Sequence, residues 1–285
     1  MMKTRQLLST LLLAVGLLAG CTPASSSSSS SSTPIPLRVG ASPTPHAVIL
    51  EHVKPILAEQ GYDLQITVFQ DYVLPNIGLV DDELDANYFQ HLPYLNQYNA
   101  ERGTSIVSAA GIHIEPIGIY SKVYSSLDNL PNGTRVIMSN SVSDRGRLLA
   151  LLEDKGLITL VEGLDPYEDA ITSLEDAIAT NPKNLTFEAN IDAGMLVQAY
   201  NFESNCIVLI NTNYALDGGL NPLEDALTLE LGSQDNPYVN IIAVNAGDEL
   251  DPGIVALINV LLSEPVQTWI EEEFEGAVVP AVRPE

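Results

Sequence analysis

Short β-rich runs alternate with stretches of helical periodicity along most of this chain. Between residues 46 and 60 the apolar side chains recur with helical spacing and share one broad face. Thr44 and Pro45 can serve as the N-cap and the first helical residue, and Gly61 ends the pattern. The same periodicity predicts further helices at 142–155, 193–202 and 254–274, the last interrupted at Pro265.

Runs rich in β-branched and other apolar residues separate these helices. The expected strands are 37–42, 64–69, 105–112, 114–121, 134–139, 205–210 and 240–246. Strands separated by helices imply a parallel or mixed sheet that is covered on both faces. No repeating unit is visible. The pattern therefore predicts an α/β protein.

The N-terminal segment lacks this alternation. It opens MMKTRQLLSTLLLAVGLLAGC, in which two cations precede a short apolar run and small residues precede Cys21. This is the layout of a secretory signal, and the apolar run is too short to span a bilayer. The Leu-Ala-Gly-Cys sequence at its end resembles a bacterial lipobox, whose Cys becomes a lipidated N-terminus. An ordinary signal peptide cut nearby is the alternative.

Eight consecutive serines, residues 25–32, follow the lipobox. Such a run cannot bury apolar surface and has no stiffness, so it is expected to be a tether. We therefore expect a lipoprotein-type signal peptide over 1–20, and a lipidated Cys21 with a Ser-rich tether over 21–36. The anchor would place the protein on the extracytoplasmic side of a cell membrane, either periplasmic or at the cell surface.

The charge balance is strongly acidic, with 12 Lys and Arg against 37 Asp and Glu. Two of the cations lie in the expected signal, which leaves a mature net charge of about −27. Nucleic acid and anionic membrane surfaces would repel such a protein, so nucleic acid is not an expected partner. We interpret the acidic residues as a solvated surface of the kind found in saline habitats.

Cys206 is the second of two cysteines. If Cys21 is acylated, no disulfide partner remains. The apolar run CIVLI around Cys206 predicts a buried, unreactive thiol in a strand.

Motifs of enzyme chemistry are missing from the sequence. It has no glycine-rich phosphate or dinucleotide motif, no G-x-S-x-G and no H-E-x-x-H. The four histidines are scattered, and a zinc site built from His91 and His113 with distant carboxylates is the alternative. We therefore expect no enzyme, no cofactor and no bound metal. An enzyme that uses His91 as general base is the rival interpretation.

Aromatic residues concentrate in FQDYVLPN and NYFQHLPY. Rings from both stretches fall between a strand end and a helix start, where ligands bind in α/β sheets. Any single one of these rings could be core, but their alternation with amides favours the wall of a binding site. The rings are Tyr72, Tyr88, Phe89, His91 and Tyr94, and the interleaved amides are Asn87 and Gln90.

Two further stretches carry polar chemistry. In MSNSVSDRGRLLALL a strand leads into the start of a helix beside Arg145 and Arg147, and a guanidinium there suits a carboxylate ligand. Surface arginines that balance acidic neighbours are the alternative. In LINTNYALDGGLNP a buried strand ends at Asn211 and Asn213, whose amides can bind both charged groups of a zwitterion or simply form a turn.

These stretches together resemble the NlpA/MetQ family, the lipid-anchored substrate-binding proteins of methionine ABC transporters. The resemblance runs from about Leu37 to Pro280, and the block DANYFQHLPY after DYVLPN is its most specific part. It implies a two-lobed type II periplasmic-binding-protein-like fold with hinge crossovers. Residues 37–121 and 238–285 would form lobe 1, and residues 122–237 would form lobe 2.

The resemblance also implies roles for seven residues. Tyr72, Phe89, His91 and Tyr94 would line an apolar slot for a thioether, Arg147 would clamp an α-carboxylate, and Asn211 and Asn240 would bind the ammonium or the carboxylate. The expected function is capture of methionine (L- or D-methionine, or a short methionine peptide) by a monomer. The captured ligand would pass to a permease driven by its own ATPase.

Two departures from the family pattern bear on the ligand. Asp144-Arg145 stands where Asn-Gln is expected, and EANIDAGMLVQAYNFESN differs from the usual Asp-Ala-Ala-Gln segment. A lipid-anchored surface protein of the same fold, with another small ligand or an adhesive role, is the alternative function.

Overall fold

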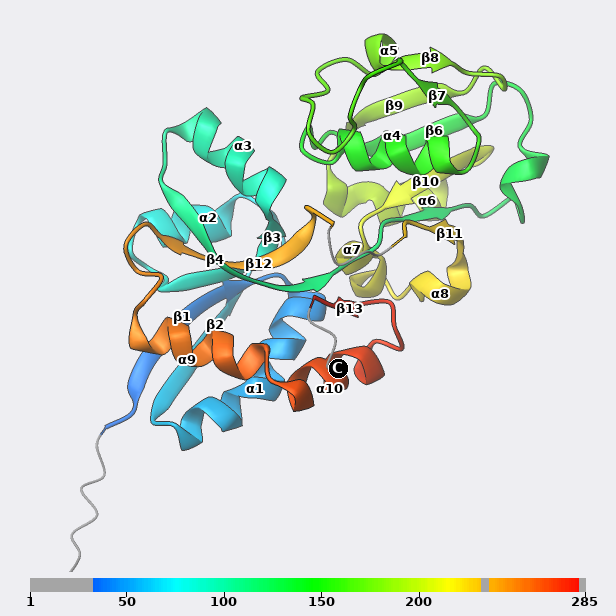
Figure 1. Cartoon of the computed structure of the whole chain (residues 1–285). Coiled ribbons are helices and arrows are strands. Elements are labelled where there is room, and N and C mark those ends of the chain that lie inside the picture. Colours follow the sequence, from blue (N-terminus) through cyan, green and yellow to red (C-terminus); the bar gives the residue numbers. More distant parts are fainter. Residues whose placement is uncertain (1–32, 232–235, 282–285) are drawn as a thin grey trace, which may run out of the picture. The chain divides into compact units, whose positions relative to one another are not determined.

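The strands of this protein form two main sheets (Figure 1). The structure, a computed structural model, describes residues 33–231 and 236–281. The larger sheet has six strands in the order β13-β4-β12-β3-β1-β2, and the smaller has five in the order β11-β5-β10-β6-β9. The short strands β7 and β8 pair with each other. The expected signal peptide, the tether and Cys21 lie outside the described residues.

The six-stranded sheet is mixed, as the sequence predicted. Strand β1 is parallel to β2 and β3, whereas β12 is antiparallel to β3 and β4. The strands are β1 (Ile35–Ala41), β2 (Tyr62–Val68), β3 (Ala86–His91), β4 (Ile106–Ile114), β12 (Val239–Asn245) and β13 (Val279–Pro280).

Helices cover both faces of this sheet (Figure 1). One apolar core joins it to α1 (Val48–Glu59), α9 (Pro252–Leu261) and α10 (Glu264–Glu273). A second core joins it to α2 (Leu74–Val80) and α3 (Leu92–Arg102). The predicted break at Pro265 is confirmed, because this proline lies in the first turn of α10. Within the described ranges no single helix is long and apolar enough to cross a membrane, although α9 and α10 together, bent by 56°, reach that length and composition.

The five-stranded sheet is also covered on both faces. Its strands are β5 (Gly118–Tyr120), β6 (Arg135–Ser139), β9 (Thr186–Ile191), β10 (Cys206–Ile210) and β11 (Ala226–Leu229). Successive side chains of strand β10 pack on opposite faces of the sheet. Ile207 and Leu209 pack with α4 (Arg145–Asp154), whereas Val208 and Ile210 pack with α6 (Leu196–Phe202). Cys206 is buried in this strand, which confirms its predicted burial and strand position.

Shorter elements complete this part of the chain. They are β7 (Thr159–Leu160), β8 (Ile178–Thr180), α5 (Leu174–Ala177), α7 (Thr212–Asp217), α8 (Pro222–Asp225) and the single helical turns Pro43–Ala47, Leu127–Asn129 and Ala193–Met195.

The expectation of one strand over 114–121 is wrong. The structure ends β4 at Ile114 and begins β5 at Gly118, in the other sheet. Pro116 lies between them, and a proline has no backbone N–H to donate to a strand ladder. The passage from one sheet to the other therefore precedes residue 121, where we placed the end of the first lobe.

Sheet membership follows the chain in three blocks. Residues 35–114 and 239–280 supply the six-stranded sheet, and residues 118–229 supply the five-stranded sheet. The chain therefore passes between the sheets twice, once after β4 and once after β11. The division into two lobes that move as bodies stays a prediction.

Candidate functional site

A cavity lies where the strand ends of the two sheets meet. Including its opening to solvent, it holds about 420 Å³ that no atom fills. All seven side chains that the resemblance implied line it. The full lining is Tyr72, Phe89, Gln90, His91, Tyr94, Glu115, Ile117, Asp144, Arg147, Asn211, Thr212, Asn213 and Asn240.

Three aromatic rings form one wall of the cavity. The ring centroids of Tyr72, Phe89 and Tyr94 lie 6.0 to 6.1 Å apart in tilted and edge-on pairs, the arrangement that aromatic rings prefer. The Tyr94 hydroxyl donates a hydrogen bond to the backbone carbonyl of Tyr72 over 2.7 Å, which fixes the loop after β2 against α3. The Tyr72 hydroxyl in turn donates to Asn213 Oδ1 over 2.7 Å. The wall is therefore held in place by its own hydroxyls.

The amide side chains that alternate with these aromatic residues in the sequence take part in a buried hydrogen-bond network. Asn87 is fully buried and donates to Asn76 Oδ1 over 2.8 Å, and Gln90 donates to the same oxygen over 2.7 Å. Asn76 donates back to Gln90 Oε1 over 3.0 Å. Asn87 does not line the cavity, whereas Gln90 does. The expected alternation of rings and amides thus includes a buried amide network that joins α2 to β3 behind the wall.

Arg147 lies on the first turns of α4 and is almost completely buried. Its guanidinium donates to Glu230 through Nε over 3.1 Å and also through Nη2, and Nη2 donates to the backbone carbonyl of Glu115 over 2.9 Å. The Arg147 Cζ lies 4.4 Å from the ring centroid of Tyr238. Burial alone would lower the pKa of Arg147, but the charges of Glu230 and Asp144 raise it above its ordinary value. Arg147 is therefore a fixed cation at the cavity.

Arg145 has no part in this arrangement. Its Nη1 donates to the backbone carbonyls of Ile171 and Thr172, over 3.3 and 2.7 Å, on the outside of α4. The structure does not place Arg145 in the lining of the cavity.

Asp144 and His91 bridge the two sheets across the cavity. His91 Nε2 donates to Asp144 Oδ1 over 3.1 Å, and Asn211 donates to Asp144 Oδ2 over 3.3 Å. Burial alone would raise the pKa of Asp144, but the hydrogen bond and charge of His91, the charge of Arg147 and the amide of Asn211 outweigh it and lower that pKa. Asp144 is therefore ionised at neutral pH. Sequence reasoning noted it only as a departure from the family pattern.

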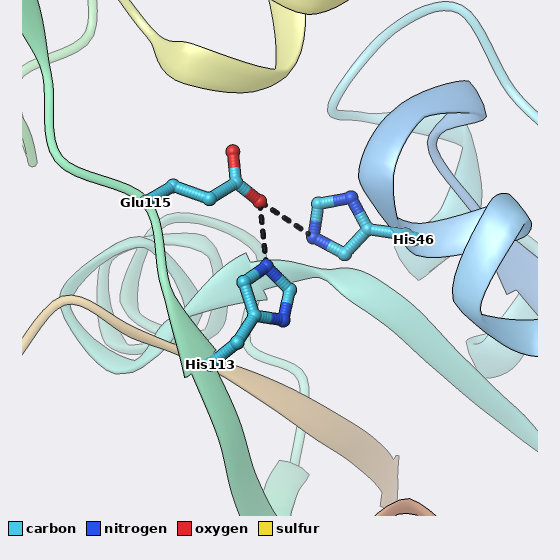
Figure 2. A group of neighbouring side chains, drawn as sticks. All are labelled: His46, His113 and Glu115. Carbon is cyan, nitrogen blue, oxygen red and sulfur yellow. Dashed lines mark hydrogen bonds and ion pairs between the residues drawn. The ribbon is translucent and has the colours of Figure 1, made fainter. Parts of the chain in front are cut away.

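Glu115 is a second buried carboxylate in the lining, and the sequence analysis gave it no role. It follows β4 directly and lies between two histidines (Figure 2). His113 Nε2 donates to Glu115 Oε1 over 2.8 Å, and His46 Nε2 lies 3.2 Å from the same oxygen. Glu115 Oε2 accepts from the backbone N–H of Asn213 over 2.9 Å. The sequence did contain a clue to Glu115. This carboxylate follows a strand and directly precedes Pro116, and a polar group at the end of a strand lies at the edge of its sheet.

The two histidines are themselves fixed from behind. The Tyr88 hydroxyl donates to His113 Nδ1, and His46 Nε2 also donates to Asn240 Oδ1 over 2.9 Å. Burial lowers the pKa of His46 to about 4 and the pKa of His113 to about 3, so both rings are neutral at physiological pH.

The alternative zinc pair of His91 and His113 is not assembled. His91 bonds to Asp144, while the donor atoms that lie within 4.8 Å of one another belong to His46, His113 and Glu115. The types and closeness of these three residues make the cluster a metal site to consider.

Comparisons with known proteins bear on what the cavity holds. The model of the NlpA lipoprotein family matches residues 37–282. The methionine-binding lipoprotein MetQ of Bacillus subtilis (strain 168) is 44% identical over 85% of this chain and 86% of its own length. A nutrient-binding protein from Burkholderia cenocepacia, solved bound to methionine, is 36% identical with a TM-score of 0.78, and the match covers 86% of this chain and all of that one. An ABC transporter periplasmic substrate-binding protein from Coxiella burnetii is 35% identical with a TM-score of 0.77 over 86% of this chain and 99% of that one.

Proposed function

Because this chain belongs to the NlpA lipoprotein family, we propose that it is the substrate-binding lipoprotein of an ABC importer and that its ligand is methionine. The observation that carries the proposal is the single cavity in which an aromatic wall faces a buried guanidinium. Methionine has an apolar thioether at one end and a carboxylate at the other, so both parts of the site have a counterpart in it.

The thioether lies against Tyr72, Phe89 and Tyr94 in this proposal. A methionine sulfur is polarisable and gains from aromatic contact, by about 0.3–1.5 kcal/mol. The unbranched side chain also follows an irregular apolar slot without strain. His91 completes this wall and, through Asp144, connects it to the opposite side of the cavity.

The α-carboxylate binds Arg147. Glu230 and the Glu115 carbonyl occupy Nε and Nη2, whereas Nη1 has no hydrogen bond to the described residues and lies 3.9 Å from Asp144 Oδ1. A charge-assisted hydrogen bond from Nη1 to the ligand is the strongest contact on offer in the cavity. The amides of Asn211 and Asn240 line the same end and supply further donors and acceptors.

Capture follows from the division of these contacts between two sheets. Each side alone binds weakly, and a closed form is favoured by the difference in ligand affinity between the open and closed states. The closed protein then docks on the permease, whose cytoplasmic ATPase supplies the energy. The lipid on Cys21 keeps a monomer on the extracytoplasmic side of the membrane.

No catalysis belongs to this proposal. Both ring nitrogens of His91, the rival general base, are engaged, since Nδ1 accepts from the Tyr94 N–H over 3.2 Å and Nε2 bonds to Asp144. A general base needs a free lone pair within reach of substrate.

The first test is mass spectrometry of protein purified without added ligand, because tight binders retain their cargo. Titration calorimetry of the stripped protein with L-methionine, D-methionine, a methionine dipeptide and a panel of other amino acids then ranks the ligands. We expect a methionine compound to bind most tightly. A protein that retains no cargo and responds to none of these compounds would leave the proposal without support and favour the adhesive alternative.

A further inference from the structure

Glu115 is a carboxylate at the cavity that lacks a cationic hydrogen-bond partner among the described residues. Only 6% of its surface is exposed. Its carboxylate lies against the rings of His46 and His113 (Figure 2). It also accepts a hydrogen bond from the backbone N–H of Asn213. Both rings are neutral, because burial holds the pKa of each far below its ordinary value. Burial accordingly raises the pKa of the Glu115 carboxyl, and the nearby groups only partly counter this.

The other acidic groups near the cavity differ in this respect. Glu230 forms an ion pair with Arg147. Asp144 also lies beside Arg147, with 3.9 Å between its Oδ1 and Arg147 Nη1. Glu115 meets Arg147 only through its backbone carbonyl, not through its carboxylate. Burying a carboxylate without a cation costs free energy. A cation brought by a ligand would therefore stabilise the protein more at Glu115 than at Glu230 or Asp144.

A metal ion is the first such cation to consider. The Nε2 of His113 lies 2.8 Å from Glu115 Oε1, which is a direct hydrogen bond. Two ligands bound to one tetrahedral zinc at about 2.0–2.1 Å are separated by roughly 3.4 Å, so an ion would have to push this pair apart. The Tyr88 hydroxyl donates to His113 Nδ1, which leaves the Nε2 proton to be donated to Glu115. The cluster is therefore built as a hydrogen-bond network.

An organic ammonium group suits the position better. The Arg147 guanidinium donates to the Glu115 backbone carbonyl over 2.9 Å, and both residues line the same cavity. An α-amino acid carries its carboxylate and its ammonium on neighbouring atoms. A ligand whose carboxylate lies on Arg147 therefore brings its ammonium close to Glu115.

We propose that the Glu115 carboxylate is the counter-ion of the ligand's α-ammonium group, and that His46 and His113 are positioning residues that hold it at the cavity wall. This inference rests on the proposed function, because it takes an amino acid as the ligand. With this counter-ion the site prefers an amino acid to a carboxylic acid that carries the same thioether side chain but lacks the amino group.

The experiment compares two ligands on the mature lipoprotein, stripped of cargo and kept in detergent. L-methionine and 4-(methylthio)butanoate differ only in the amino group. Titration calorimetry on the wild type is expected to show L-methionine binding about 10- to 100-fold more tightly, the range of a hydrogen bond between charged groups. In Glu115→Gln the affinity for L-methionine falls by a similar factor and the affinity for the deaminated acid stays unchanged. The preference is then lost.

Glu230→Gln is the matched control, since it also converts a buried carboxylate to an amide beside Arg147. It acts on the carboxylate end, which both ligands share, so both affinities change together and the preference remains. His46→Asn is expected to reduce the preference rather than both affinities, because it loosens Glu115 without removing its charge. A preference that survives in Glu115→Gln, or a uniform loss for both ligands there, overturns the proposal.

Two further measurements separate other outcomes. A crystal structure of the wild type with L-methionine tests the contact directly, even if Glu115→Gln does not fold. The proposal is overturned if the ammonium nitrogen of the ligand is bound only by Asp144 or by amide groups. Stoichiometric zinc in the purified wild type that disappears in Glu115→Gln would assign the cluster to a metal instead. Failure of the wild type to bind L-methionine at all would count against the proposed function, not against Glu115 alone.

Discussion

Arg147 and Glu230 form an ion pair that is almost completely excluded from solvent, with Arg147 Nε donating to Glu230 Oε2 over 3.1 Å. Arg147 lies on α4, whereas Glu230 follows β11 at the point where the chain returns toward the six-stranded sheet. The pair therefore fixes the guanidinium at the cavity before any ligand arrives. A cation held in this way loses little conformational entropy on binding a carboxylate.

Arg147→Ala is expected to abolish measurable ligand binding and also to destabilise the protein. Removing one partner of a buried ion pair leaves the other charge uncompensated, which costs about 3–5 kcal/mol. Titration calorimetry measures the first effect, and chemical denaturation measures the second. Arg145→Ala is the control, because Arg145 lies two residues earlier on the same helix and donates to the backbone carbonyls of Ile171 and Thr172. Unchanged affinity in Arg147→Ala would refute the assignment of this residue.

The aromatic wall predicts a preference for sulfur. L-norleucine replaces the sulfur of L-methionine with a methylene group, and it is expected to bind about 2- to 10-fold more weakly, the range of a sulfur–aromatic contact. Phe89→Leu keeps an apolar side chain but removes a ring, so the preference should narrow in this variant. Competition titration with the two ligands measures both ratios. The wall would have no such role if the ratio were the same in the wild type and in Phe89→Leu.

The buried histidines predict loss of stability in mild acid. The pKa of His46 is lowered from 6.5 to about 4 and that of His113 from 6.5 to about 3, chiefly by burial. Below pH 6.5 the two histidines bind protons in the unfolded chain but not in the folded chain. Their contribution to stability is therefore complete above pH 6.5 and is lost as the pH falls toward their pKa values in the folded state. Between pH 7 and 5 the expected loss is up to about 2 kcal/mol of unfolding free energy per histidine.

Other groups around these rings modify that dependence. Glu115 has the opposite effect on stability as the pH falls. Its pKa is raised in the folded state, so the folded chain binds this proton at a higher pH than the unfolded chain does. Tyr88 and Asn240 contribute hydrogen bonds without a charge. Thermal unfolding at a series of pH values should show a smaller acid slope in His46→Asn than in the wild type. His52→Asn, on the outer side of α1 where His52 stacks on Trp269, is the control. Equal slopes in all three proteins would remove the buried histidines as the cause.

Cys206 predicts slow thiol chemistry. Its side chain is 4% exposed within β10, and burial raises the pKa of its thiol, so little thiolate forms and little of it is accessible. A maleimide reagent should leave Cys206 unlabelled in the native mature protein and label it after unfolding in guanidinium. Peptide mapping by mass spectrometry gives the extent of labelling. Rapid labelling of the native protein would mean that β10 opens far more often than its packing implies.

Hydrophobic patterning located several buried elements, but it missed β3, whose aromatic and amide residues were expected between a strand end and a helix start. Strand β10 was expected at 205–210 and lies at Cys206–Ile210, because every side chain in it is apolar and buried. The helix expected at 46–60 is α1, whose apolar face packs on the six-stranded sheet. The expected start was wrong, because α1 begins at Val48 after a separate turn over Pro43–Ala47, and Thr44 is not its N-cap. Strand β9 was missed for the complementary reason. It lies at the edge of its sheet, its residues TFEANI are only partly buried, and no continuous apolar run marks it.

The sequence by itself determined the local chemistry: which segments bury apolar side chains, where aromatic rings concentrate, and which arginines stand at the start of a helix. All seven residues that the family resemblance implied line one cavity. Only the tertiary structure decided which distant residues surround each buried charge. Glu115 meets His46 across 69 positions of chain, and Arg147 meets Glu230 across 83, and no local pattern encodes such distant partners. The physical reason is that periodicity reports burial along one element, whereas the neutralisation of a buried charge depends on which elements the fold brings side by side.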